Sequence, residues 1–123
     1  MATIGSFTKS GNPKNMRVVT SAAAAKTDTV ELAGLPDGYQ KYYLGVQMFD
    51  AQGDLMLDSA GTFAVTYKTK STMQYETPAY GTPIDATAPG TVPITGNVYG
   101  VKVVPSSLST TVTWVVVLTC NKG

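Results

Sequence analysis

The sequence contains no histidine and one cysteine, Cys120, and only 14 % of its residues are charged. Without histidine, the chain cannot build a Ser–His or Cys–His nucleophile or a histidine-ligated metal site from its own residues. A lone cysteine cannot form an internal disulfide, and no metal-ligand spacing surrounds it. We therefore expect Cys120 to be a partly buried residue at a strand end, and the protein to be no enzyme and to need no cofactor.

Two further absences exclude other classes of partner. The net charge is +1 and the sequence has no basic run, so nucleic acid is not an expected partner. No segment approaches about 18 consecutive apolar residues, and the start of the chain lacks the apolar core of a signal peptide. We therefore expect a protein that begins at or near Met1, is made in a cytoplasm and does not span a membrane.

What the chain does contain is enough apolar sequence for a folded domain. Its 123 residues, of which 43 % are hydrophobic, predict a single domain over residues 1–123. No helix with an apolar stripe and no internal repeat can be found. Seven to nine short strands, separated by Gly, Pro, Asn and Asp turns, are typical of an all-β sandwich, and we expect a jelly-roll-like one.

The C-terminal segment gives the strongest strand signal. Two runs rich in β-branched residues, Val98–Val104 and Thr110–Thr119, flank a short connection with turn residues, which predicts a β-hairpin. Trp114, in the middle of the second run, is predicted to lie in the core; a sugar-stacking platform is the alternative. Alternation places five residues on its face: Val112, Trp114, Val116, Leu118 and Cys120.

Other strands follow from the same alternation. The predicted strands are Met16–Thr20, Thr27–Ala33, Lys41–Phe49 and Thr62–Lys70. Phe63, Val65 and Tyr67 are predicted to point inward. Val30 and Leu32 share one face of their strand, and Leu44, Val46 and Met48 share one face of theirs.

A proline-rich segment, Thr77–Gly96, separates these strands from the C-terminal runs. It holds four of the seven prolines, and proline cannot donate a hydrogen bond to a sheet. A loop of this length is either functional or disordered. We expect an extended arm or long loop, packed on its own or on a neighbouring subunit through Tyr80, Ile84, Val92 and Ile94.

Three evenly spaced carboxylates, Asp50, Asp54 and Asp58, could suggest a Ca²⁺ loop or an acid–base pair. The spacing lacks the residue order of an EF-hand loop. Aspartates beside a turn glycine usually bind nearby amides, so we expect turn formers and no metal site.

The last strand has apolar residues on both faces. Val115 and Val117 share a face with threonines, where an exposed sheet would be polar. Together with the low charge, this predicts self-association, with Val115 and Val117 under a neighbouring subunit or under the arm. The seven tyrosines would suit protein or glycan contacts.

Two stretches resemble small β-sandwich virion proteins of tailed bacteriophages. In Gly45–Lys68, a strand is followed by an aromatic-Asp-x-x-Gly turn, a short return, Ala-Gly-Thr and a second strand. Gly96–Thr119 has a β-run, Pro-Ser, Leu, a Thr-rich link and a last strand. The chain departs from the family at Ser71–Glu76, where Met73 and Tyr75 stand in place of a frequent Trp.

The resemblance implies a structural role in a virion. It implies a capsid decoration or cement protein that binds the major capsid protein and stabilises the shell as a homotrimer on the capsid surface. The alternative is a receptor- or glycan-binding module of a head fibre or tail. The expected interface residues are Tyr80, Ile84, Val92, Ile94, Val115 and Val117.

Overall fold

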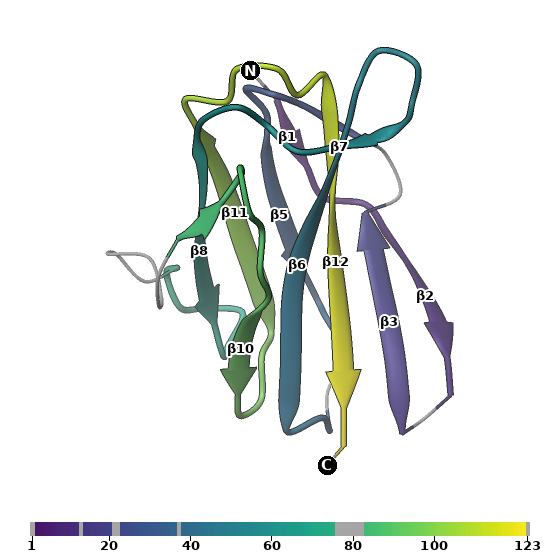
Figure 1. The fold of residues 1–123 in the computed structure, drawn as a ribbon. Coiled ribbons are helices and arrows are strands. Elements are labelled where there is room, and N and C mark those ends of the chain that lie inside the picture. The colour runs from purple at the N-terminus through teal and green to yellow at the C-terminus, as the bar shows by residue number, and fades with distance from the viewer. Residues whose placement is uncertain (1, 13, 21–22, 37, 76–82, 123) are drawn as a thin grey trace.

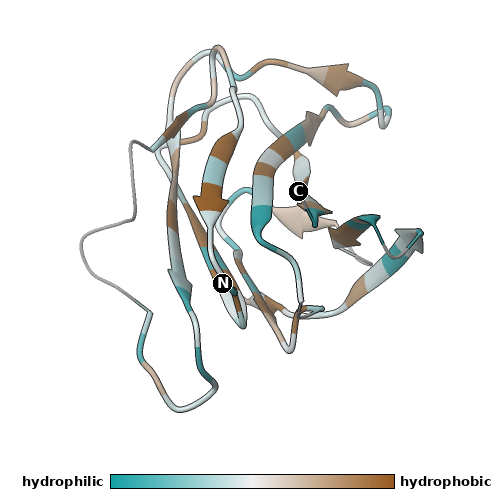
Figure 2. Cartoon of the chain, turned by 90° about the horizontal axis from the view of Figure 1, so that it is seen from below, coloured by the Kyte–Doolittle hydropathy of each residue, from teal (hydrophilic) through white to brown (hydrophobic). Residues whose placement is uncertain are grey.

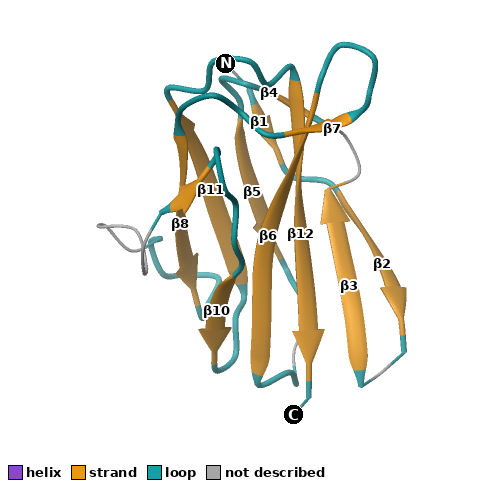
Figure 3. Ribbon diagram, in the orientation of Figure 1, coloured by secondary structure: helices purple, strands orange, loops and turns teal. Residues whose placement is uncertain are grey.

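The computed structural model describes residues 2–12, 14–20, 23–36, 38–75 and 83–122. Within these ranges the chain forms twelve strands and no helix (Figure 3). None of the described residues belongs to a helix long and apolar enough to cross a membrane. The strands are β1 (Thr3–Ile4), β2 (Phe7–Gly11), β3 (Asn15–Thr20), β4 (Ala24–Ala25), β5 (Thr29–Ala33), β6 (Lys41–Phe49), β7 (Leu55–Met56), β8 (Thr62–Lys68), β9 (Ile84–Asp85), β10 (Val92–Thr95), β11 (Gly100–Ser106) and β12 (Thr113–Asn121).

The strands form two sheets, which pack as a sandwich (Figure 1). The smaller sheet has the order β1-β5-β11-β8-β9, and the larger has the order β10-β6-β12-β3-β2, with β4 paired to β12 and β7 paired to β6. Four strands (β1, β4, β7 and β9) have only two residues, and the other eight match the seven to nine predicted. The prediction of an all-β sandwich is confirmed, whereas the jelly-roll-like detail stays a prediction.

The core lies between the two sheets and is built by alternation along the strands (Figure 2). Trp114 is fully buried, and its ring centroid lies 4.8 Å from that of Phe63, which comes from the opposite sheet. The Trp114 Nε1–H donates to the carbonyl oxygen of Ala25 at 2.8 Å, so the polar atom of the indole is also satisfied. The core prediction for Trp114 is confirmed, and the sugar-platform alternative is wrong.

The prediction of a C-terminal hairpin is wrong. β11 lies between β5 and β8 in the smaller sheet, while β12 lies between β6 and β3 in the larger. The connection between them therefore crosses from one sheet to the other. Val112, predicted to point inward, is 46 % exposed because β12 begins only at Thr113.

A distant carboxylate, Asp58, explains why the connection between β11 and β12 crosses between the sheets. Its oxygens accept hydrogen bonds from the backbone N–H groups of Ser109 at 2.9 Å, Thr110 at 3.0 Å and Thr111 at 2.8 Å. These bonds hold three consecutive residues of the connection around one point. Such a bend directs the chain into the other sheet and not back along β11.

The proline-rich segment does not form a free arm in its described part. Residues 83–96 contain β9 and β10, and Ile84, Val92 and Ile94 are buried in the chain's own core. Their apolar side chains thus pack within the chain's own fold, which is one of the two placements expected for this segment, while a contact with a neighbouring subunit stays a prediction. Pro93 lies in β10, at the edge of the larger sheet, where a missing N–H group is tolerated. Tyr80 and the rest of 77–82 lie outside the described residues.

Candidate functional site

One edge of the larger sheet has a gap. β10 pairs with the first half of β6, from Lys41 to Leu44, and β7 pairs with its end, at Met48 and Phe49 (Figure 1). Between them, the described strands leave Gly45–Gln47 without a partner on this side.

The backbone of Val46 points into this gap. Val46 lies opposite Val116 of β12. The N–H and C=O of Val116 point away from β6, toward the buried hydroxyl of Thr20. This hydroxyl accepts from the N–H at 3.0 Å and donates to the C=O at 3.3 Å. In an antiparallel pair, opposite residues either exchange both hydrogen bonds or both point outward. Val46 therefore directs its own N–H and C=O away from β12.

An apolar groove of about 490 Å³ lies at this gap. The β7 segment supplies one wall, with Leu55 68 % and Leu57 61 % exposed. Single exposed leucines are ordinary, but two beside an apolar groove mark an interaction surface. Gln47 is the one polar residue among the described lining residues, which are Val46, Gln47, Met48, Leu55, Met56, Leu57 and Pro89.

The outer face of the larger sheet adjoins the groove. Val115 lies opposite Gln47 of the groove lining, and Val117 lies opposite Gly45 on one side and Val19 on the other. Val115 and Val117 are half-buried on this outer face. The structure thus brings the two predicted interface residues together beside the gap, while their contact with a neighbouring subunit stays a prediction.

Asp58 is the most buried carboxylate among the described residues, at 3 % exposure. Besides the three amides of the connection, it accepts from the N–H of Ala60 at 2.9 Å and from the hydroxyl of Thr111 at 2.6 Å. Burial alone would raise its pKa, but the hydrogen bonds from Thr111, Ser109 and Ala60 outweigh it and hold the pKa of Asp58 far below its usual value. Its oxygens are occupied by the fold, so the group is a structural anchor and no acid or base.

The other carboxylates behave as the turn prediction requires. Asp50 Oδ1 accepts from the N–H groups of Gln52 at 2.9 Å and Asp54 at 3.0 Å, which closes the turn between β6 and β7. In the part of the chain that the structure describes, no three His, Cys, Asp or Glu side chains gather to hold a metal ion. The turn-former prediction is confirmed for Asp50, whereas Asp58 makes one local bond of this kind, to Ala60, and directs its other bonds to the distant connection.

Cys120 is fully buried, which is more than the partial burial predicted. Burial raises the pKa of its thiol to about 11, so the thiol stays protonated near neutral pH. A protonated, buried thiol is no nucleophile, and Cys120 acts as a small core residue.

Sequence reasoning missed a cluster on the outer face of the smaller sheet. The Tyr75 ring lies under the Lys68 ammonium at 4.6 Å and the Lys102 ammonium at 6.0 Å. A Cβ placed on Gly100 would lie 2.8 Å from its hydroxyl and 3.0 Å from the carbonyl oxygen of Leu32, so a larger residue there would displace the tyrosine. Burial, followed by the carboxylate of Glu31, raises the pKa of Tyr75 to about 12. The contact joins residues of four separate segments, so no local pattern could reveal it.

The geometry defines a two-sheet β-sandwich with an apolar groove at one sheet edge. The chain belongs to the family described as domain of unknown function (DUF7265), whose model matches residues 14–123. No curated protein matches the sequence. Among solved structures, the chain is similar to a protein of Bacillus endospore appendages, which form a family of disulfide-linked pili, with 12 % identity and a TM-score of 0.41 over 98 % of this chain and 94 % of that one. A similarity of this size supports no conclusion about this chain.

Proposed function

We propose that this protein is a non-enzymatic structural subunit that works by binding other protein chains. The observation that carries the proposal is the apolar groove beside β7, with Leu55 and Leu57 exposed at its rim and the Val46 backbone N–H and C=O directed toward it. Apolar walls beside a sheet edge suit a protein segment better than a small polar substrate.

The finer form of the proposal is a capsid decoration or cement protein of a tailed bacteriophage, which binds the major capsid protein as a homotrimer. It rests on the sequence resemblance of Gly45–Lys68 and Gly96–Thr119. Gly45–Lys68 includes most of the groove lining, and Val115 and Val117 belong to the second stretch. The part of the chain that resembles virion proteins thus also holds the candidate binding surface.

A receptor- or glycan-binding module remains the alternative from another class. Its support has weakened, because Trp114 is buried and Tyr43, at 38 % exposure, is the most exposed described aromatic residue. A glycan site usually needs an exposed aromatic platform beside polar groups.

Quantitative mass spectrometry of purified virus particles tests the proposed function. A cement protein is expected at a copy number comparable to that of the major capsid protein, and a fibre module at a few copies per particle. Leu57→Lys, which places a charge at the groove rim, should reduce binding to particles that lack the protein. Lys26→Glu, which lies outside the groove, is the control. Absence of the chain from particles, or equal binding by both variants, would count against the proposal.

A further inference from the structure

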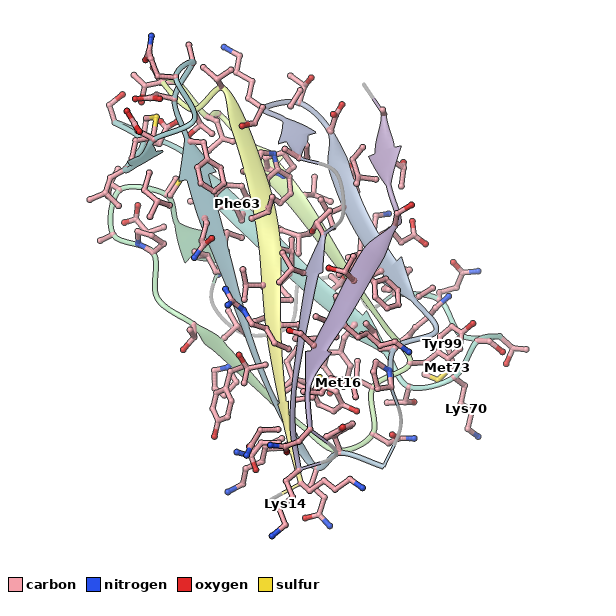
Figure 4. All side chains as sticks on the ribbon, turned by 90° about the vertical axis from the view of Figure 1, so that its right-hand side faces the viewer. Lys14, Met16, Phe63, Lys70, Met73 and Tyr99 are labelled. Carbon is pink, nitrogen blue, oxygen red and sulfur yellow. The ribbon has the colours of Figure 1, made fainter. Side chains whose placement is uncertain are left out.

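One end of the larger sheet is basic. Asn121, near the end of β12, lies opposite Asn15 on one side and Lys41 on the other. The N–H of Lys122 donates to the carbonyl oxygen of Lys14 at 3.1 Å. The side chains of Lys14, Lys41 and Lys122 therefore share this end, which we call the basic end, and Figure 4 shows Lys14 at the tip of the sandwich.

The opposite end of the same sheet is acidic. Thr113, at the start of β12, lies opposite Phe49, which Asp50 follows, and Asp54 closes the β6–β7 turn through the bond between Asp50 N–H and Asp54 C=O at 3.0 Å. Asp28 belongs to the same end, because its N–H donates to Ala25, the residue opposite Thr113 on the other side. We call Asp28, Asp50 and Asp54 the acidic end; Lys26 lies in the same turn, and the positive charge of the N-terminus also acts on Asp28.

The two ends are too far apart to neutralise each other. β12 has nine residues, so about 27 Å separates its ends at roughly 3.3 Å per residue. This distance exceeds the Debye length of about 8–10 Å at moderate salt. Each described end thus keeps its own sign of charge toward solvent, while Asp37 and Glu76 lie outside the described residues.

One end offers a cleft and the other a projecting turn. The basic end has a cleft of about 450 Å³ lined by Lys14, Asn15, Asn121 and Lys122. At the acidic end, the turn Asp50–Asp54 projects beyond the sheets (Figure 1) and leads directly into Leu55 and Leu57 of the groove. A lysine side chain suits this surface, because its apolar stem can pack on leucine while its ammonium reaches a carboxylate.

We propose that copies of this chain associate head to tail, with the acidic turn of one copy in the basic cleft of the next. The proposal rests on the proposed function and names a second copy of this chain as the occupant of the surface. A head-to-tail contact uses two different patches, so it closes into a ring, such as the expected trimer, or grows into a filament, according to the rotation between copies.

Sedimentation velocity of the purified protein, without particles, tests the proposal. Wild-type protein should associate at low salt and dissociate as the salt concentration approaches 1 M. Asp54→Lys, and the double change Lys14→Glu with Lys122→Glu, should each weaken self-association by roughly tenfold or more. Lys26→Glu is the control for net charge. It changes the net charge by the same amount as the reversal of one lysine at the basic end, but it lies at the acidic end and should not weaken association.

A mixture of the two variants gives the decisive test of head-to-tail association. The Asp54→Lys protein keeps an unchanged basic end, and the Lys14→Glu/Lys122→Glu protein keeps an unchanged acidic end, so each protein supplies the surface that the other has lost. A mixture of the two should regain association that neither shows alone, with thermal unfolding of each variant confirming that it is folded. A wild type that stays monomeric at all salt concentrations, or a mixture that gains nothing, would overturn head-to-tail association. Binding to virus particles by such a monomer would leave the proposed function standing.

Discussion

Replacement of Asp58 by Asn should destabilise the protein by about 2–4 kcal/mol at pH 7. The Asp58 carboxylate accepts from four backbone N–H groups and one hydroxyl, and it is 3 % exposed. An amide nitrogen in place of Oδ2 would face the N–H groups of Thr110 and Thr111, and each buried donor left unpaired costs about 1–3 kcal/mol. For a domain with about 5–15 kcal/mol of stability, this is a large loss.

The pH dependence of the unfolding free energy distinguishes the contribution of the Asp58 carboxylate from other effects of the substitution. The folded-state pKa of Asp58 lies below its unfolded value, so its contribution is fully present above about pH 4 and is lost as the pH falls further. Urea unfolding of the wild type and Asp58→Asn should differ most at neutral pH and converge in acid. Asp54→Asn is the control, since Asp54 is exposed. Equal stability of the wild type and Asp58→Asn at pH 7, or a difference that does not change with pH, would refute the anchor role.

Three other substitutions test the fold, each by chemical unfolding. Trp114→Ala should cost about 3–5 kcal/mol, the usual range for a large core aromatic residue, and a loss below about 1 kcal/mol would contradict its packing on the opposite sheet. Thr20→Val should cost about 1–3 kcal/mol, because the N–H of Val116 loses its buried acceptor; unchanged stability would show that the hydroxyl is dispensable. Gly61→Ala should also destabilise the protein, since Gly61 has a φ of 92° and a Cβ there would lie 2.8 Å from the Ser107 carbonyl oxygen; a neutral effect would mean that the loop shifts freely.

The strands themselves could be predicted because alternation is a local signal. The bounds of Lys41–Phe49 match β6, and Leu44, Val46 and Met48 share one face as expected, which is the face that points into the core. In the strand predicted as Thr62–Lys70, Phe63 and Val65 are buried and Tyr67 packs against the core. Each of these placements depends only on neighbours within one strand.

The pairing of strands could not be predicted with equal success. The connection after Pro105 has turn residues that would serve a hairpin as well as a crossing between sheets. The choice is made by Asp58, about fifty residues earlier in the sequence, whose role a local pattern does not reveal. For the same reason, Pro93 favoured an arm, although the edge position of β10 accommodates it.

The candidate site was predictable only in part. Val115 and Val117 were identified by a break in alternation and lie beside the groove. The groove itself depends on β7 and β10 pairing with separate halves of β6, which is a product of the tertiary fold. The separation of charge between the two ends likewise appears only once β3, β6 and β12 are aligned.

Carbodiimide cross-linking tests head-to-tail association most directly, because it joins a carboxylate to an amine in direct contact. A mixture of ¹⁵N-labelled and unlabelled protein at low salt distinguishes links between chains from links within one chain. Head-to-tail association predicts mixed-label peptides that join Asp50 or Asp54 to Lys14 or Lys122. All of these links should be lost in high salt, and the links at position 54 should also be lost in the Asp54→Lys protein. Links between chains that avoid both ends, or that join the same end of two copies, would contradict it.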